Sequence, residues 1–197
     1  LFLLDEIVTS SGSATVQFND NSTIIFKKNT YFKVTEFNLS GAKDIFIGEV
    51  MKGSVVIESG KIAKNDSGLM RIKLPKMDLE IKGTRFNVDN KPDGTSEVAL
   101  SEDSFGNVGT INISTEGEVK TLYTPDQVVV LTEDQGFSER PQSDEEKQSF
   151  QSVSEDLVES SKIDENEIQK QLEKKLLEGK LEDADGDGKI DLNDVEA

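Results

Sequence analysis

The sequence predicts a mainly β domain followed by a short, acidic α-helical tail. Apolar and polar residues alternate through most of residues 1–133, and Gly, Asn and Asp fill nearly every gap between the alternating runs. Past Pro141 the apolar period changes from two to 3.6 residues. Many short strands at close spacing, with no helical period between them, are typical of an all-β sandwich, barrel or solenoid. The pattern does not decide among these three architectures.

The first strands form a predicted hairpin. Ala14, Val16 and Phe18 alternate with polar residues, Asn19-Asp20-Asn21 supplies a turn, and an apolar run resumes at 23–26. Further alternating runs predict strands at 31–37, 45–58, 69–74, 79–81, 85–88, 97–100, 108–113, 119–123 and 127–131. We expect the core to include Val16, Phe18, Ile25, Val55, Ile81, Phe86, Val98 and Ile113.

After the β domain, residues 134–142 are predicted to be a linker and 143–180 an amphipathic helical segment. Ser143 and Glu146 have the spacing of a capping box, which predicts a helix over 143–160, and a second helix is expected over 164–179. Narrow apolar stripes need a surface to cover, so these helices should pack on the β domain, each other or another subunit. The stripes contain Phe150, Val153, Leu157 and Val158, then Leu172, Leu176 and Leu177.

Composition excludes several kinds of site. The 197 residues include no cysteine, histidine or tryptophan. Cysteine nucleophiles, histidine general bases, Ser-His triads and thiolate or histidine zinc sites are therefore absent. The formal net charge of −17 repels phosphate backbones and anionic lipid, and it leaves cations or basic protein surfaces as natural partners. We accordingly expect no nucleic-acid partner.

Six segments of the β region lie in an order that identifies a family resemblance. They are Asp5-Glu6-Ile7-Val8-Thr9, then 13–22, Tyr31-Phe32-Lys33-Val34, 48–55, Leu79-Glu80-Ile81-Lys82-Gly83-Thr84-Arg85-Phe86-Asn87-Val88, and Glu97-Val98-Ala99-Leu100. Together they resemble the FecR domain family, bacterial cell-envelope modules best known from the periplasmic part of iron-transport signalling regulators. The segment around Gly83-Thr84 is the most specific of the six.

The resemblance implies an antiparallel, sandwich-like or solenoid-like β domain at residues 1–133. It also implies a non-catalytic protein with protein partners, in the periplasm or outside the cell, and in a larger assembly. We expect the motif residues themselves to serve as scaffold. No apolar run is long enough to span a membrane, and Leu1-Phe2-Leu3-Leu4 is followed at once by Asp5-Glu6. Because the chain begins inside the family pattern and without methionine, a segment before Leu1 is expected.

The tail carries a second pattern, which resembles the EF-hand calcium loop at residues 183–194. Carboxylates stand at the first, third, fifth, ninth and twelfth positions, and Gly188 stands at the sixth. Alternate carboxylates on a tight loop supply the oxygen ligands that Ca²⁺ prefers. The expected ligands are Asp183, Asp185, Asp187, the Lys189 carbonyl, Asp191 and Asp194, and no other cofactor is predicted.

Three functions fit these observations. The first is a non-catalytic cell-envelope or extracellular interaction module with a calcium-stabilised tail. The alternative is the periplasmic signalling domain of a FecR-type sigma-factor regulator. The third is carbohydrate handling with Asp78 and Glu80 as an acid pair, which share one face of a strand. Surface carboxylates on a chain of net charge −17 need no catalytic role, so we predict that the protein is not an enzyme.

Calorimetry tests the calcium loop. Carboxylates crowded on twelve residues repel one another, so a bound ion should order the loop, with a dissociation constant of about 10⁻⁴ to 10⁻³ M. The double variant Asp183→Ala with Asp187→Ala should release no binding heat. The prediction is wrong if the parent chain gives no heat at several millimolar calcium, or if both chains give equal heats.

Overall fold

The computed structural model describes residues 5–39, 43–132, 136–148 and 150. In that part of the chain the strands join into one continuous sheet, and none of the helices is long and apolar enough to cross a membrane. The elements in order are β1 (Glu6–Val8), β2 (Ala14–Gln17), β3 (Thr23–Phe26), β4 (Tyr31–Asn38), β5 (Ile45–Glu58), α1 (Lys61–Lys64), β6 (Leu69–Leu74), β7 (Met77–Lys82), β8 (Arg85–Asn90), β9 (Ser96–Ser101), β10 (Thr110–Ser114), β11 (Val119–Leu122), β12 (Gln127–Thr132) and β13 (Gly136–Pro141).

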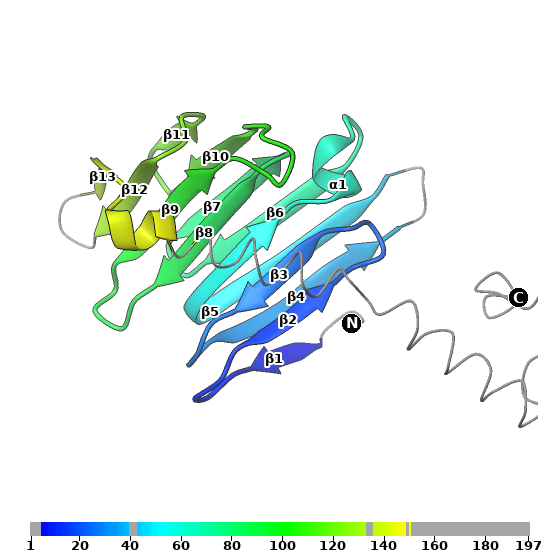
Figure 1. Cartoon of the computed structure of the whole chain (residues 1–197), viewed down its shortest axis with the longest axis horizontal. Coiled ribbons are helices and arrows are strands. Elements are labelled where there is room, and N and C mark those ends of the chain that lie inside the picture. The colour runs from blue at the N-terminus through cyan, green and yellow to red at the C-terminus, as the bar shows by residue number, and fades with distance from the viewer. Residues whose placement is uncertain (1–4, 40–42, 133–135, 149, 151–197) are drawn as a thin grey trace, which may run out of the picture. The chain divides into compact units, whose positions relative to one another are not determined.

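The long strand β5 belongs to two sheets. Its first half, residues 45–49, lies between β4 and β6. Its second half, from residue 55 to 58, lies between β3 and β8. The first sheet is therefore β1-β4-β5-β6-β7-β10-β11, and the second is β2-β3-β5-β8-β9-β12-β13 (Figure 1). Because β5 is common to both, the two sheets are arms of one curled sheet.

Both arms enclose one hydrophobic core. Phe32 and Ile72 from the first sheet are fully buried in the same cluster as Phe86 and Val98 from the second. At the far ends of the arms, Nζ of Lys120 on β11 lies 2.5 Å from Oε1 of Glu139 on β13. The outermost strands of the two sheets therefore approach each other. The described strands therefore form a mainly β, curled sheet that closes around one core, and they show no repeating coil.

The residues expected in the core fall into three groups. Ile25 is buried, but it lies on the opposite face of the second sheet, because its neighbours Ile24 and Phe26 face the core cluster. Val16 is only partly buried, because β2 is an edge strand. The others are buried in the core cluster as predicted, namely Phe18, Val55, Ile81, Phe86, Val98 and Ile113.

The expected linker at residues 134–142 instead contains a strand. β13 pairs with β12 along its whole length, from Gly136 opposite Thr132 to Pro141 opposite Gln127. Phe137 is its one large apolar residue and packs against the core. The strand was not predicted because charged residues and proline interrupt the alternation, and an edge strand tolerates both. The β domain therefore continues beyond residue 133.

One strand pair departs from the antiparallel arrangement that the resemblance implied. β5 and β6 run parallel, with Ile45 opposite Leu69 and Glu49 opposite Lys73. A parallel pair needs a crossover connection, and the segment that contains α1 supplies it. Alternation of apolar residues is the same in both directions, so the sequence pattern could not distinguish them.

The capping box at the start of the tail is confirmed. Residues 144–148 are helical, the Ser143 backbone N–H donates to Oε2 of Glu146 (2.7 Å), and the Glu146 N–H donates to Oγ of Ser143 (3.2 Å). Arg140, at the end of β13, donates to both carboxylate oxygens of Glu146 at 2.8 and 2.6 Å. These contacts fix the direction in which the chain leaves the sheet.

The start of this helix covers the outer face of the second sheet (Figure 1). Phe150 is 5% exposed and lines the same groove as Val56 of β5. Val56, Ala99 and Val128 lie on the sheet face opposite the core, and each is nearly fully buried. Phe150 thus packs on the β domain as predicted. The rest of the two expected helices, including Leu157, Leu172 and Leu176, lies outside the described residues.

The core packing predicts a large cost for Phe86→Ala. The side chain is fully buried, so its removal should lower the free energy of unfolding by about 3 to 5 kcal/mol in urea denaturation. Phe105→Ala is the matched control, because Phe105 is 81% exposed and its loss should change stability by less than about 0.5 kcal/mol. A change under about 1 kcal/mol for Phe86→Ala would contradict the packing.

The contact between Arg140 and Glu146 predicts a pH-dependent contribution to stability. The hydrogen bonds from Arg140 lower the pKa of Glu146 to about 2. A carboxyl with a lowered pKa stabilises the fold above its unfolded-state pKa, and that contribution is lost as the pH falls through the folded-state value. Glu146→Gln should therefore lower the free energy of unfolding at neutral pH, and its difference from the parent should shrink from about pH 5 toward about pH 2.

The exposed neighbour Glu145 supplies the matched control. Glu145→Gln removes one carboxylate from the same helical turn but leaves the contact between Arg140 and Glu146 in place, so it should lower the free energy of unfolding at neutral pH less than Glu146→Gln does. Parallel pH profiles for the two variants would show that the Arg140–Glu146 contact does not stabilise the domain.

Candidate functional site

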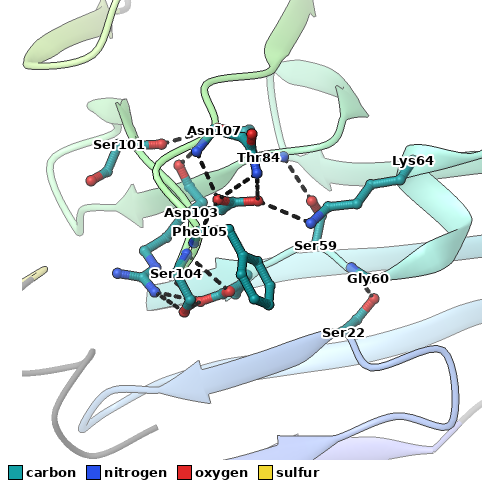
Figure 2. Close-up of polar contacts among 12 residues, drawn as sticks. Ser22, Ser59, Gly60, Lys64, Thr84, Ser101, Asp103, Ser104, Phe105 and Asn107 are labelled. Carbon is teal, nitrogen blue, oxygen red and sulfur yellow. Dashed lines mark hydrogen bonds and ion pairs between the residues drawn. The ribbon is translucent and has the colours of Figure 1, made fainter. Parts of the chain in front are cut away.

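The motif segment around Gly83-Thr84 lies at the centre of a buried polar network (Figure 2). Thr84 is fully buried between the end of β5 and the end of β9. Its backbone N–H donates to Oγ of Ser59 (2.7 Å), and its hydroxyl donates to the carbonyl of Ser101 (3.0 Å). The Ser59 N–H donates back to the Thr84 carbonyl at 3.1 Å. Gly83 has φ +60°, which admits a side chain only with strain.

A second motif segment, at the β2–β3 turn, is joined to the start of α1. The carboxylate of Asp20 accepts hydrogen bonds from the backbone and hydroxyl of Ser22 at 3.0 and 2.7 Å, and from the N–H of Ile62 at 3.2 Å. The Ser22 hydroxyl oxygen accepts the Gly60 N–H at 2.9 Å. A Cβ at Gly60 would lie 2.2 Å from the Asp20 carbonyl oxygen, so only glycine fits there. This turn therefore orders α1 from across the fold.

An ion pair connects the motif strand to the loop that follows β9. Arg85, next to Thr84, is 5% exposed, and its guanidinium pairs with the carboxylate of Glu58. The side chains of Arg85 and Glu58 are both hydrogen-bonded to Ser104. The Arg85 Nη2 donates to Oγ of Ser104 (2.6 Å), which donates to Oε2 of Glu58 (2.8 Å), while the Ser104 N–H donates to Oε1 (3.2 Å).

The adjacent residue Asp103 closes the same loop. Its side chain is fully buried. Oδ1 accepts the backbone N–H groups of Phe105 and Asn107, each at 2.9 Å, and Oδ2 accepts Nζ of Lys64 at 2.9 Å. Burial raises the pKa of Asp103, but the hydrogen bonds from Asn107, Lys64 and Phe105 outweigh it and hold the pKa at about 2. One ionised carboxylate therefore fixes the loop backbone.

The far end of this loop is held by close backbone contact. A Cβ at Gly109 would lie 1.9 Å from the Lys82 carbonyl oxygen and 2.2 Å from that of Gly83. Only glycine can approach the motif segment so closely. We refer to residues 103–109 as the Asp103 loop. It is fixed at Asp103, at Ser104 and at Gly109.

The tip of the Asp103 loop presents an aromatic ring to solvent. Phe105 is 81% exposed, and Val108 in the same loop is 38% exposed. The Lys64 ammonium lies 5.6 Å from the centroid of the Phe105 ring. The sequence pattern did not identify this loop. Residues 103–107 lie between two predicted strands, but the strand predicted at 108–113 begins only at Thr110, because Val108 and Gly109 belong to the loop. A single aromatic residue among turn-forming residues, in Asp103-Ser104-Phe105-Gly106-Asn107, was the available signal.

The residues considered as a catalytic acid pair or predicted as calcium ligands are not part of the Asp103 loop. Asp78 and Glu80 share a face of β7, and the Glu80 carboxylate lies 3.8 Å from both Arg71 and Lys82. Those are ordinary surface ion pairs. The proposed calcium ligands at 183–194 lie outside the described residues, so calcium binding remains a prediction. The site that the structure does describe is the Asp103 loop, whose backbone is hydrogen-bonded to Asp103 and whose tip exposes Phe105.

One family model and two solved structures match this chain. The family model described as FecR protein matches residues 5–104. None of the curated proteins matches the chain. A crystal structure of a putative anti-sigma factor from Parabacteroides distasonis ATCC 8503 has a TM-score of 0.58 at 17% identity, over 71% of this chain and 61% of that one.

A second crystal structure described in the same words has a TM-score of 0.59 at 15% identity, over 75% of this chain and 64% of that one. This chain thus spans less than two thirds of the length of each structure, and identities this low establish a shared fold alone. The family match covers just over half of the chain and includes the Asp20, Gly60 and Gly83-Thr84 segments described above. The chain belongs to the FecR protein family.

Proposed function

We propose that this chain is the periplasmic signalling domain of a FecR-type sigma-factor regulator. The observation that carries the proposal is the family match over residues 5–104 together with a fold shared with two structures described as putative anti-sigma factors. In such a role the domain receives a signal from one protein and passes it toward a sigma factor. The proposed activity is binding and relay, without catalysis.

The arrangement of the motif residues supports a role of this kind. Thr84, Asp20 and Arg85 are each at most 5% exposed, and they bond to other parts of the fold. Residues in such positions hold a shape and do not act on a substrate. A regulator needs a stable surface with a defined loop geometry, because binding to a pre-organised surface costs less conformational entropy. The Asp103 loop is a surface of that description.

The other function left open by the sequence is a structural envelope module with a calcium-stabilised tail. It draws support from the acidic residues 139–197, which contain 19 acidic and 8 basic residues, and from the loop at 183–194. The family and fold comparisons favour the signalling function. A calcium-stabilised tail is compatible with either, so calcium binding alone does not separate them.

Transcript profiling in the source bacterium tests the proposal. An in-frame deletion of the codons for residues 5–104 should change a set of transcripts that share one sigma-factor promoter sequence, and the parent gene should restore them. The proposal fails if no such set changes under conditions in which the protein is produced. Envelope defects such as detergent sensitivity, without a transcript change, would support the structural module.

A further inference from the structure

The Asp103 loop has a property that its structural role does not explain. Phe105 is the loop's only aromatic side chain, and it is 81% exposed although its own backbone N–H and those of its neighbours Ser104 and Gly106 are all hydrogen-bonded. Phenylalanine is among the residues most often fully buried in folded proteins. Here a fixed backbone presents a large apolar group to water.

Fixing this loop requires two buried charged groups. Asp103 and Arg85 are each 5% exposed, and burial of a charge is costly unless it is paired and hydrogen-bonded. Asp103 is paired with Lys64, and Arg85 with Glu58. Both pairs converge on residues 103–107, on either side of Phe105. The loop geometry is therefore set before any partner arrives.

We propose that Phe105 is the anchor residue of a protein-docking surface, which inserts into an apolar pocket on a partner protein. Buried aromatic anchors contribute most of the binding energy in many interfaces, and a rigid aromatic side chain loses little conformational freedom on binding. Val108 extends the apolar area on the same loop. The inference rests on the proposed function only for the partner's identity, namely the protein that delivers the signal to this domain.

The positive charges near the Phe105 ring indicate which charge the edge of the partner's pocket should carry. Lys64 is 40% exposed and lies against the Phe105 ring, and Lys61 on the same helical turn is exposed. The Lys64 ammonium has three N–H donors, and Asp103 accepts a hydrogen bond from one of them. A carboxylate at the edge of the partner's pocket would therefore meet Lys64 as the ring enters. The partner's contact surface is apolar at its centre and acidic at its rim.

The same observations disfavour a lipid membrane as the surface that Phe105 contacts. A single phenylalanine buries too little area to hold a protein on a membrane, where stable attachment usually takes two signals. The net charge of −17 also repels anionic lipid. A second copy of the chain, in a symmetric pair, would bring its own Lys61 and Lys64 against the same two lysines, and like charges repel, so we infer that the partner is a different protein.

The test begins with a photoreactive phenylalanine analogue placed at position 105 of the full-length protein in the source bacterium. The matched control places the analogue at Val119, which is 72% exposed on β11. Position 105 should crosslink to one protein that position 119 does not reach. Crosslinking to a second copy only, to lipid only, or equally from both positions would overturn the proposal.

The crosslinked protein is then purified, and its affinity for the full-length chain is measured by calorimetry. Phe105→Ala should weaken binding at least about tenfold, Phe105→Trp should retain most of it, and Val119→Ala should leave it unchanged. Because Phe105 is exposed, the variants should keep the parent's thermal stability, which serves as the folding control. Equal affinities for the parent and Phe105→Ala would overturn the proposal.

The two proposals can fail separately. If the chain binds its partner through Phe105 and no sigma-dependent transcript responds to Phe105→Ala, the docking surface stands and the signalling function falls. If transcripts respond to deletion of the domain while Phe105→Ala has no effect on them or on binding, the signalling function stands and the docking surface falls.

Discussion

The fold depends on one constraint, the sharing of strand β5 between two sheets. Its first half completes one sheet and its second half completes the other, so neither sheet can form its full set of strand pairs without it. The two arms then face each other across one core. The same strand ends at Glu58, which pairs with Arg85, and the next residue, Ser59, bonds to Thr84. The polar network that supports the Asp103 loop is thus attached to the central strand.

This arrangement explains why family motifs and function need not coincide in the same residues. Asp20, Gly60 and Thr84 hold three separate parts of the chain together, and none of them is exposed enough to meet a partner. Their effect appears at a distance, where the Asp103 loop emerges beside the motif strand (Figure 2). In this account the buried polar contacts of the scaffold produce a fixed surface, and the exposed residues on that surface determine the partner.

Local patterns in the sequence predicted a large part of the fold because they report local physics. Period-two alternation located most strands and the core residues Phe18, Phe86 and Val98, since alternation follows directly from strand geometry. The capping box at Ser143 was equally predictable, because both partners lie within one helical turn.

The features that escaped prediction depend on contacts between distant residues. The parallel direction of β6 is set by a crossover, and β13 forms because β12 offers it an edge. The order of the Asp103 loop requires Lys64, 39 positions earlier, and Glu58, 46 positions before Ser104. No window of the sequence around Phe105 contains either of those groups, so the loop reads as an ordinary turn.

The central claim is that the buried carboxylate of Asp103 holds the Asp103 loop, and with it Phe105, in place before a partner binds. Amide hydrogen exchange of the unbound protein, measured residue by residue, tests it most directly. The account predicts slow exchange at the backbone N–H of Phe105 and Asn107, which donate to Asp103, and faster exchange at both in Asp103→Ala. Exchange at the rates of an unstructured chain in the parent protein would show that the loop is not fixed and would contradict the account.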